Sequence, residues 1–148
     1  MSEERVGQQA PLRVGSTASV IRVVTQQLVE QFSAVSGDSN PIHLDPDYAK
    51  ETPFGRCIAP GLLIGSFVSA LLANELPGPG TIYLKQDLKF LKPVFLGMQV
   101  QAIVRVSHID NRRNHVTLDT QALESSAGLE LVSGQALVKV PAALLDGR

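Results

Sequence analysis

Hydrophobic positions repeat along the chain with two different periods, and the period changes near its middle. In the first half the apolar residues follow helical spacing, for example Leu28, Val29, Phe32 and Val35. In the second half they alternate with polar residues. Every even position of the range 100–106 is Val or Ala, and the range 116–122 alternates in a similar way, which is typical of strands with one buried face. Helices followed by consecutive strands predict an α+β domain with an antiparallel sheet.

Capping and turn-forming residues indicate where these elements begin and end. Thr25 can cap the first helix, and Gly37 can end it. The segment that follows, 37–44 (GDSNPIHL), is rich in turn formers and is expected to be irregular. Asp45 and Pro46 then form a cap and a first helical position, which predicts a short helix through residue 50. Further strands are expected in the ranges 14–23, 84–90 and 131–140.

A longer apolar helix is predicted from Pro60 to about Leu76. It is hydrophobic nearly all round, which indicates a buried helix around which the sheet can pack. Small residues recur on it every four positions: Gly61, Gly65, Ser69 and Ala73. This stripe allows either close packing against the sheet or space for a ligand chain, and the sequence leaves both interpretations open.

Composition limits the class of protein. The chain has 148 residues, 44% hydrophobic and 18% charged, with a net charge of −1. We interpret it as an N-terminal arm (1–13) and one domain (14–148). Near-neutral charge gives no electrostatic reason to expect nucleic acid or an anionic membrane as a partner. The longest apolar run is too short to span a bilayer, residues 1–13 lack a signal-peptide core, and the single Cys57 cannot form an internal disulfide, so a cytoplasmic location is expected.

Asp38 and His43 are the candidate proton-handling pair. Pro41 lies between them and restricts Asn40 to extended conformations, while Asn40 can bond to nearby backbone groups and stiffen the loop. A rigid loop of this kind can direct a carboxylate and an imidazole towards one water molecule. The alternative from the residues alone is structural, with Asp38 capping the loop and His43 bonding to a local carbonyl.

A second candidate feature is the pair Pro60-Gly61. If Pro60 is the first helical residue, the amide of Gly61 lies in the first turn, where backbone N–H groups have no partner within the helix. Such a helix start stabilises negative charge, and glycine allows a ligand carbonyl to approach. The pair therefore indicates a possible oxyanion site, although proline also starts many ordinary helices.

Three segments resemble the MaoC-like (R)-specific enoyl-CoA hydratases. They are FSAVSGDSNPIHLDPDYA (32–49), GRCIAPGLL (55–63) and LPGPGTIYLKQDLKFLKPVFLGMQV (76–100). Together with the last strands, the resemblance covers about residues 14–140, and SGDSNPIH is its specific core. The family commonly has histidine where this chain has Pro60 and proline where it has Cys57, which affects the shape of the thioester site.

The resemblance implies a hot-dog fold, a homodimer, and a reaction without a metal or redox cofactor. It implies that Asp38 and His43 bind the water that adds at C3 of a trans-2-enoyl-CoA and handle the proton at C2, giving a (3R)-hydroxyacyl-CoA. Gly61 matches the oxyanion glycine of the family. Ser69 matches a serine near the acyl pocket.

Other functions remain open at this point. Many hot-dog thioesterases carry a carboxylate in the central helix, whereas this helix has only Glu75 at its far end. A non-catalytic acyl-thioester-binding subunit need not retain the Asp/His pair. Within the favoured class, the sequence does not distinguish a CoA thioester from an acyl-carrier-protein thioester. It contains no G-x-S-x-G motif that would support a serine hydrolase.

Overall fold

A computed structural model of the chain describes residues 11–146, and it forms five strands and five helices over that range. The first half contains β1 (Thr17–Val23), α1 (Gln26–Ser36), α2 (Pro41–Leu44), α3 (Pro46–Lys50) and α4 (Gly61–Asn74). The second half contains β2 (Ile82–Phe90), β3 (Gln99–Asp110), β4 (His115–Glu124), β5 (Glu130–Lys139) and α5 (Ala143–Asp146). The predicted order of helices and strands is confirmed.

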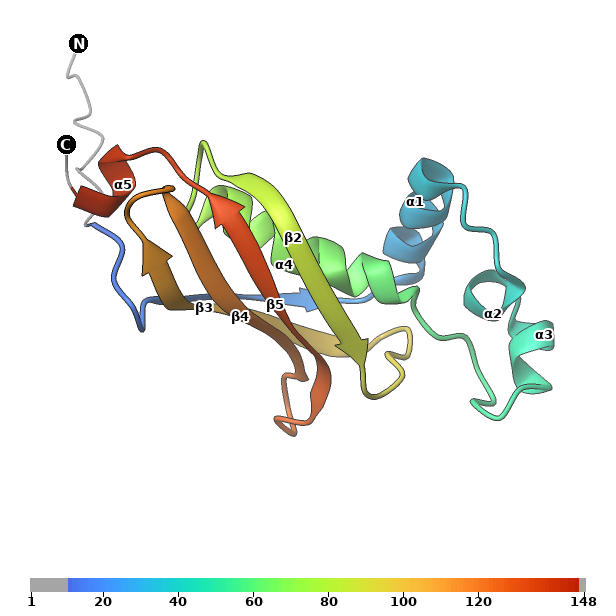
Figure 1. Cartoon of the computed structure of the whole chain (residues 1–148). Helices are drawn as coiled ribbons and strands as arrows, with labels where there is room; N and C mark the ends of the chain where they lie inside the picture. The colour runs from blue at the N-terminus through green and yellow to red at the C-terminus, as the bar shows by residue number, and fades with distance from the viewer. Residues whose placement is uncertain (1–10, 147–148) are drawn as a thin grey trace, which may run out of the picture.

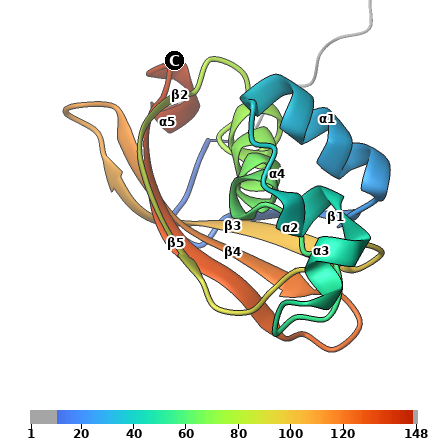
Figure 2. The same cartoon turned by 90° about the vertical axis from the view of Figure 1, so that its right-hand side faces the viewer.

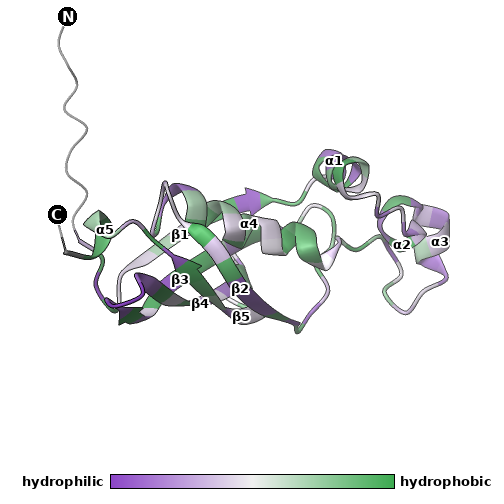
Figure 3. Cartoon of the chain, turned by 45° about the horizontal axis from the view of Figure 1, so that its top comes forward, coloured by the Kyte–Doolittle hydropathy of each residue, from purple (hydrophilic) through white to green (hydrophobic). Residues whose placement is uncertain are grey.

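The five strands form one antiparallel sheet in the order β1-β3-β4-β5-β2. The predicted alternation is also confirmed. The even positions of β3 from Val100 to Val106 are fully buried, as are Val116 and Leu118 of β4. Hydrophobic and hydrophilic positions alternate along the sheet in Figure 3. One face of the sheet is therefore the wall of the core.

Helix α4 fills the concave side of this sheet. The curved sheet partly encloses it in Figure 2, and its buried side chains include Ile64, Phe67, Val68, Leu71 and Leu72. Six of the 14 residues of α4 are buried, which removes one apolar face of the helix from water, whereas Leu62 and Ala70 on the other face are exposed. This is the hot-dog arrangement, as the sequence predicted.

Helices α1, α2 and α3 lie beyond one end of the sheet, beside the start of α4 (Figure 1). The hydroxyl of Thr25 accepts from the amide of Leu28, and Gly37 ends α1 with a left-handed φ of 78°, which confirms both predicted boundaries. The side chain of Asp45 caps α3 as expected. The segment between β1 and α4, which contains α1, α2 and α3 (residues 24–60), therefore overhangs one end of the sheet. It is called the excursion below.

Two local predictions were wrong. The segment 37–44 contains a short helix, α2, because Asn40 caps it and Pro41 supplies a preset φ at its first position. Pro60 has a φ of −58° and a ψ of 135° and precedes α4 as its N-cap, so Gly61, not Pro60, is the first helical residue.

The N-terminal end of the described chain is attached to the C-terminal helix. The amide of Leu12 donates to the carbonyl of Leu144 at 2.9 Å, and Leu12 packs against the core. Most of the predicted arm, residues 1–10, lies outside the described residues. Within the described range, no helix is both long enough and apolar enough to cross a membrane.

Candidate active site

The loop between α1 and α2 holds Asp38 in a defined orientation. The amide of Asn40 donates to Oδ1 of Asp38 at 3.1 Å, and the side chain of Asn40 accepts from the amide of Ile42 at 3.3 Å. Pro41 supplies the first residue of α2 between them. Because Oδ1 is occupied by a backbone donor, Oδ2 is the oxygen of Asp38 that is available for other contacts.

His43 is fixed by the returning chain. Its Nδ1 lies 2.7 Å from the backbone carbonyl oxygen of Ile58, and only 11% of its side chain is exposed. A carbonyl oxygen can only accept a hydrogen bond, so Nδ1 carries the proton in this contact. In the neutral ring, Nε2 is then the unprotonated nitrogen, with a lone pair that can accept a proton.

The two free atoms of the pair face one another. Nε2 of His43 and Oδ2 of Asp38 lie 3.9 Å apart. This separation is too long for a direct hydrogen bond, but one water molecule at about 2.8 Å from each atom can contact both. Since both atoms are acceptors, such a water would donate both of its hydrogens and keep a lone pair free. The arrangement can therefore orient a water nucleophile.

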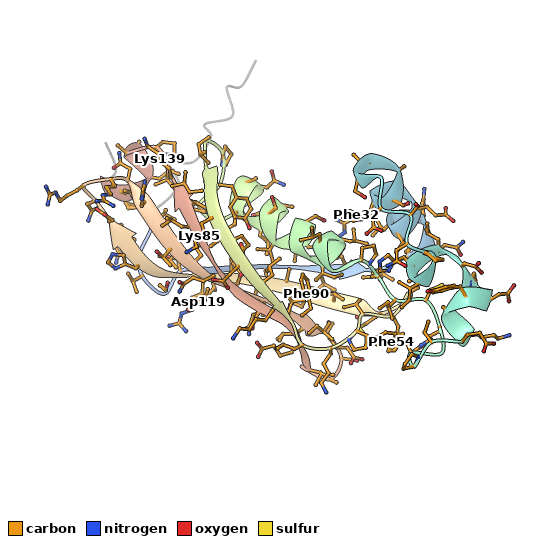
Figure 4. All side chains as sticks on the ribbon, turned by 45° about the vertical axis from the view of Figure 1, so that its right-hand side comes forward. Phe32, Phe54, Lys85, Phe90, Asp119 and Lys139 are labelled. Carbon is orange, nitrogen blue, oxygen red and sulfur yellow. The ribbon has the colours of Figure 1, made fainter. Side chains whose placement is uncertain are left out.

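Asp38 and His43 line a cavity of about 620 Å³. Its other walls are mostly apolar and include Phe32 of α1, Phe54 of the loop after α3, and Phe90 of β2. Figure 4 shows these three rings on separate elements around the junction between the excursion and the sheet. A pocket with an apolar lining and two convergent polar groups fits a ligand that is largely hydrocarbon.

Pro60 and Gly61 line the same cavity. As the first residue of α4, Gly61 has an amide that no acceptor within the helix can reach. The structure also gives a steric reason for glycine here, since a Cβ on Gly61 would lie 2.6 Å from Cε1 of Phe90. The cavity thus combines a water-orienting pair with the positive end of a helix dipole.

The sequence also matches the model of a known protein family. The model described as "MaoC like domain" matches residues 8–127 of the chain. The chain belongs to the MaoC-like family.

Named members of the family are similar over most of their length. The chain is 39% identical over 131 residues to an (R)-specific enoyl-CoA hydratase of Rhodospirillum rubrum, with 88% of this chain and 90% of that protein covered. It is 41% identical over 131 residues to a 3-hydroxybutyryl-CoA dehydratase of Methylorubrum extorquens, with 88% and 82% covered. A solved (R)-hydratase structure from A. caviae superimposes with a TM-score of 0.85 at 42% identity, over 88% of this chain and 98% of that one.

Ser69, which the MaoC-like resemblance links to the acyl pocket, does not line the cavity that contains Asp38 and His43. It lies two helical turns beyond Gly61 on α4 and lines a separate hollow between α4 and β2. Its role in acyl binding stays a prediction.

Cys57, where the family commonly has proline, lies in a smaller hollow of about 280 Å³ behind His43. Burial raises the pKa of its thiol, and the nearby carboxylate of Asp45 raises it further. The thiol therefore remains protonated at neutral pH and gives no sign of nucleophilic character.

Two contributors to the site could not be identified from the sequence. The backbone carbonyl of Ile58 orients His43. Because every residue has a backbone carbonyl, the sequence cannot show which of them will contact His43. Phe90 fits the alternation of a strand and is indistinguishable in the sequence from a core position, although the residue is 53% exposed and lines the cavity. Only the folded chain shows these contacts.

Proposed function

We propose that this chain catalyses the reversible addition of water to a trans-2-enoyl-CoA, giving a (3R)-hydroxyacyl-CoA. Membership of the MaoC-like family and its similarity to hydratases and dehydratases over 88% of the chain support this reaction class. The observation that carries the proposal is the 3.9 Å gap between Nε2 of His43 and Oδ2 of Asp38 at the wall of an apolar cavity.

The site residues have separate roles in this reaction. A water held by His43 and Asp38 attacks C3 of the enoyl group through its free lone pair, and one of its protons passes to the pair. The pair returns a proton to C2, so that the elements of water are added and the site regains its starting state. The reverse sequence is dehydration. No step of this scheme requires a metal or redox cofactor.

The start of α4 supports the same step. As the oxygen attacks C3, negative charge develops on the thioester carbonyl oxygen. In this proposal the amide of Gly61 and the helix dipole stabilise that charge, since Gly61 begins α4 and lines the cavity. Pro60 carries no N–H, so it contributes no backbone donor to this position.

The assembled enzyme is proposed to be a homodimer that pairs through β2. This strand is an edge of the sheet, and three hydrophobic residues at its start are exposed: Ile82 (58%), Tyr83 (39%) and Leu84 (46%). An unpaired edge with exposed apolar side chains favours pairing with another strand. A second copy of the chain would cover these residues.

A mutant pair tests the proposed reaction. Asp38→Asn keeps the shape of its side chain and His43→Gln keeps a polar side chain, but each change removes the proton-handling ability, so each should lower the rate of crotonyl-CoA hydration about 10²- to 10⁴-fold. Asp47→Asn and His108→Gln, which make the same changes outside the cavity, serve as controls. Near-normal turnover in Asp38→Asn and His43→Gln would contradict the proposal. Release of free CoA from a saturated acyl-CoA would instead support a thioesterase.

A further inference from the structure

The backbone amide of Asp38 is held by a side chain of the helix that precedes it. Helix α1 ends at a left-handed glycine, with a bond from the amide of Gly37 to the carbonyl of Ser33. A helix end of this type supplies no backbone acceptor for the next amide, which is that of Asp38. This amide donates instead to Oγ of Ser36 at 3.1 Å. Asp38 is therefore attached to α1 through the hydroxyl of Ser36.

The hydroxyl of Ser36 is itself fixed in direction. It donates its hydrogen to the carbonyl of Phe32, one turn back in α1, at 2.6 Å. Because that hydrogen is committed, the lone pairs of Oγ are left to accept from the amide of Asp38. Phe32 and Ser36 both line the active-site cavity. The hydroxyl thus links the wall of the cavity to the backbone of the reactive carboxylate.

Two hydrogen bonds then define where the carboxylate of Asp38 points. The amide of Asp38 is held by Ser36, and its Oδ1 accepts from the amide of Asn40 at 3.1 Å. Without the Ser36 hydroxyl, only the second of these bonds would remain. The backbone at Asp38 could then rotate, which would change the 3.9 Å gap between its Oδ2 and Nε2 of His43. One water molecule can bond to both atoms only over a narrow range of such gaps.

We propose that Ser36 is a positioning residue that sets the orientation of Asp38 towards the bridging water. It acts through the backbone amide of Asp38 and not through contact with the reacting atoms. Its hydroxyl has no second hydrogen to donate to a ligand, since the only one is donated to Phe32. This inference rests on the proposed hydratase function.

The first test removes the hydroxyl and measures the hydration of crotonyl-CoA. Ser36→Ala should lower kcat roughly tenfold with little change in KM, because a misoriented pair impairs the reaction more than it impairs binding. Ser39→Ala removes a hydroxyl from an exposed position of the same loop that does not line the cavity, so it is the control and should leave kcat unchanged.

A matched pair of variants isolates the hydroxyl from the shape of the side chain. Threonine can make the same bond to the carbonyl one turn back, and valine has nearly the same shape without the hydroxyl. Ser36→Thr should therefore retain most of the wild-type kcat, whereas Ser36→Val should lose about as much as Ser36→Ala. Because position 36 is exposed, both side chains can be accommodated, and the pair gives an answer even if Ser36→Ala does not fold.

A double variant separates positioning from a general loosening of the loop. In the Asp38→Asn background the carboxylate is already lost, so adding Ser36→Ala should lower the residual kcat by less than about twofold. The bond from the amide at position 38 is present in both backgrounds, so the loss of thermal stability caused by Ser36→Ala should be the same in each.

Two results would overturn the inference. One is full kcat in both Ser36→Ala and Ser36→Val. The other is a tenfold loss that persists undiminished in the Asp38→Asn background, because Ser36 would then act on the site as a whole and not through the carboxylate. A wild type without crotonyl-CoA hydration would refute the proposed function instead.

Discussion

His43 donates from Nδ1 to the carbonyl oxygen of Ile58, fifteen residues later in the chain, over 2.7 Å. This bond does more than hold the ring in place, since it fixes which nitrogen faces Asp38 without a proton. The sequence left open whether His43 bonds to a carbonyl or serves as a catalytic base. The structure shows that these alternatives are compatible, because each uses a different nitrogen of the ring.

Asn40→Ala should weaken both the loop and the activity. Asn40 caps α2 through its side chain, and loss of such a cap costs about 1 kcal/mol. Because α2 carries His43, we also expect roughly a tenfold fall in kcat/KM for crotonyl-CoA. Asn40→Asp keeps an acceptor at the cap and should retain most of the activity. Thermal unfolding and steady-state kinetics measure the two effects, and no change in either for Asn40→Ala would show that the cap is dispensable.

Gly61→Ala should be destabilising because of Phe90. The added Cβ would lie 2.6 Å from the ring, and such overpacking typically costs about 1–3 kcal/mol. The double variant Gly61→Ala with Phe90→Ala should recover this loss, which a double-mutant cycle in urea would show as a coupling free energy. If the loss persisted without the ring, the need for glycine would have another origin, such as close approach of the thioester.

Cys57 should react slowly with iodoacetamide in the folded protein. The thiolate is the reactive form, and a raised pKa means that less thiolate is present at any given pH below it. The rate at pH 8 should therefore be lower than in the urea-unfolded chain and should increase as the pH rises. Asp45→Asn keeps a cap for α3 but removes the negative charge, so it should accelerate the reaction. Equal rates in the folded and unfolded protein would contradict this.

Leu84→Lys should disrupt the proposed dimer. Leu84 lies on the edge strand β2 at an irregularity in its pairing with β5, and a charged residue at an edge opposes pairing with another strand. Light scattering after size exclusion should show a monomer. Ile21→Lys makes the same kind of change at an equally exposed position on the opposite edge, β1, and should remain dimeric. A monomer in Ile21→Lys alone would place the interface on β1.

The fold could be predicted because its signals are local and periodic. The alternation from Val100 to Val106 requires one buried face, and Thr25 and Gly37 define the ends of α1 through contacts within a few residues. The register of the pairing between β2 and β5 could not be predicted from the sequence in the same way. Its irregularity between Tyr83 and Lys85 places Tyr83 opposite the buried Val138, and such a shift depends on the partner strand.

The site could be predicted only in part. Asp38, Asn40, Pro41 and His43 form a continuous motif, so their proximity follows from the chain itself. The separation of Ser69 from that group could not be foreseen, because it depends on where the cavity ends along α4, which is set by elements distant in the sequence. The aromatic side chains that line the cavity could not be predicted from the sequence either. They come from elements that meet only in the folded protein.

The hydrogen bonds at the end of the excursion, just before α4, control how often the site opens locally. Ile58 holds the imidazole through its carbonyl, and the next residue, Ala59, donates its amide to the carbonyl of Val94 at 2.7 Å. Arg56 adds a contact over the ring of Phe95 at 3.9 Å. An opening event that broke these links could detach the reactive groups while the sheet remained folded. Hydrogen exchange at the Ala59 amide would therefore measure how often a folded molecule is transiently unable to react.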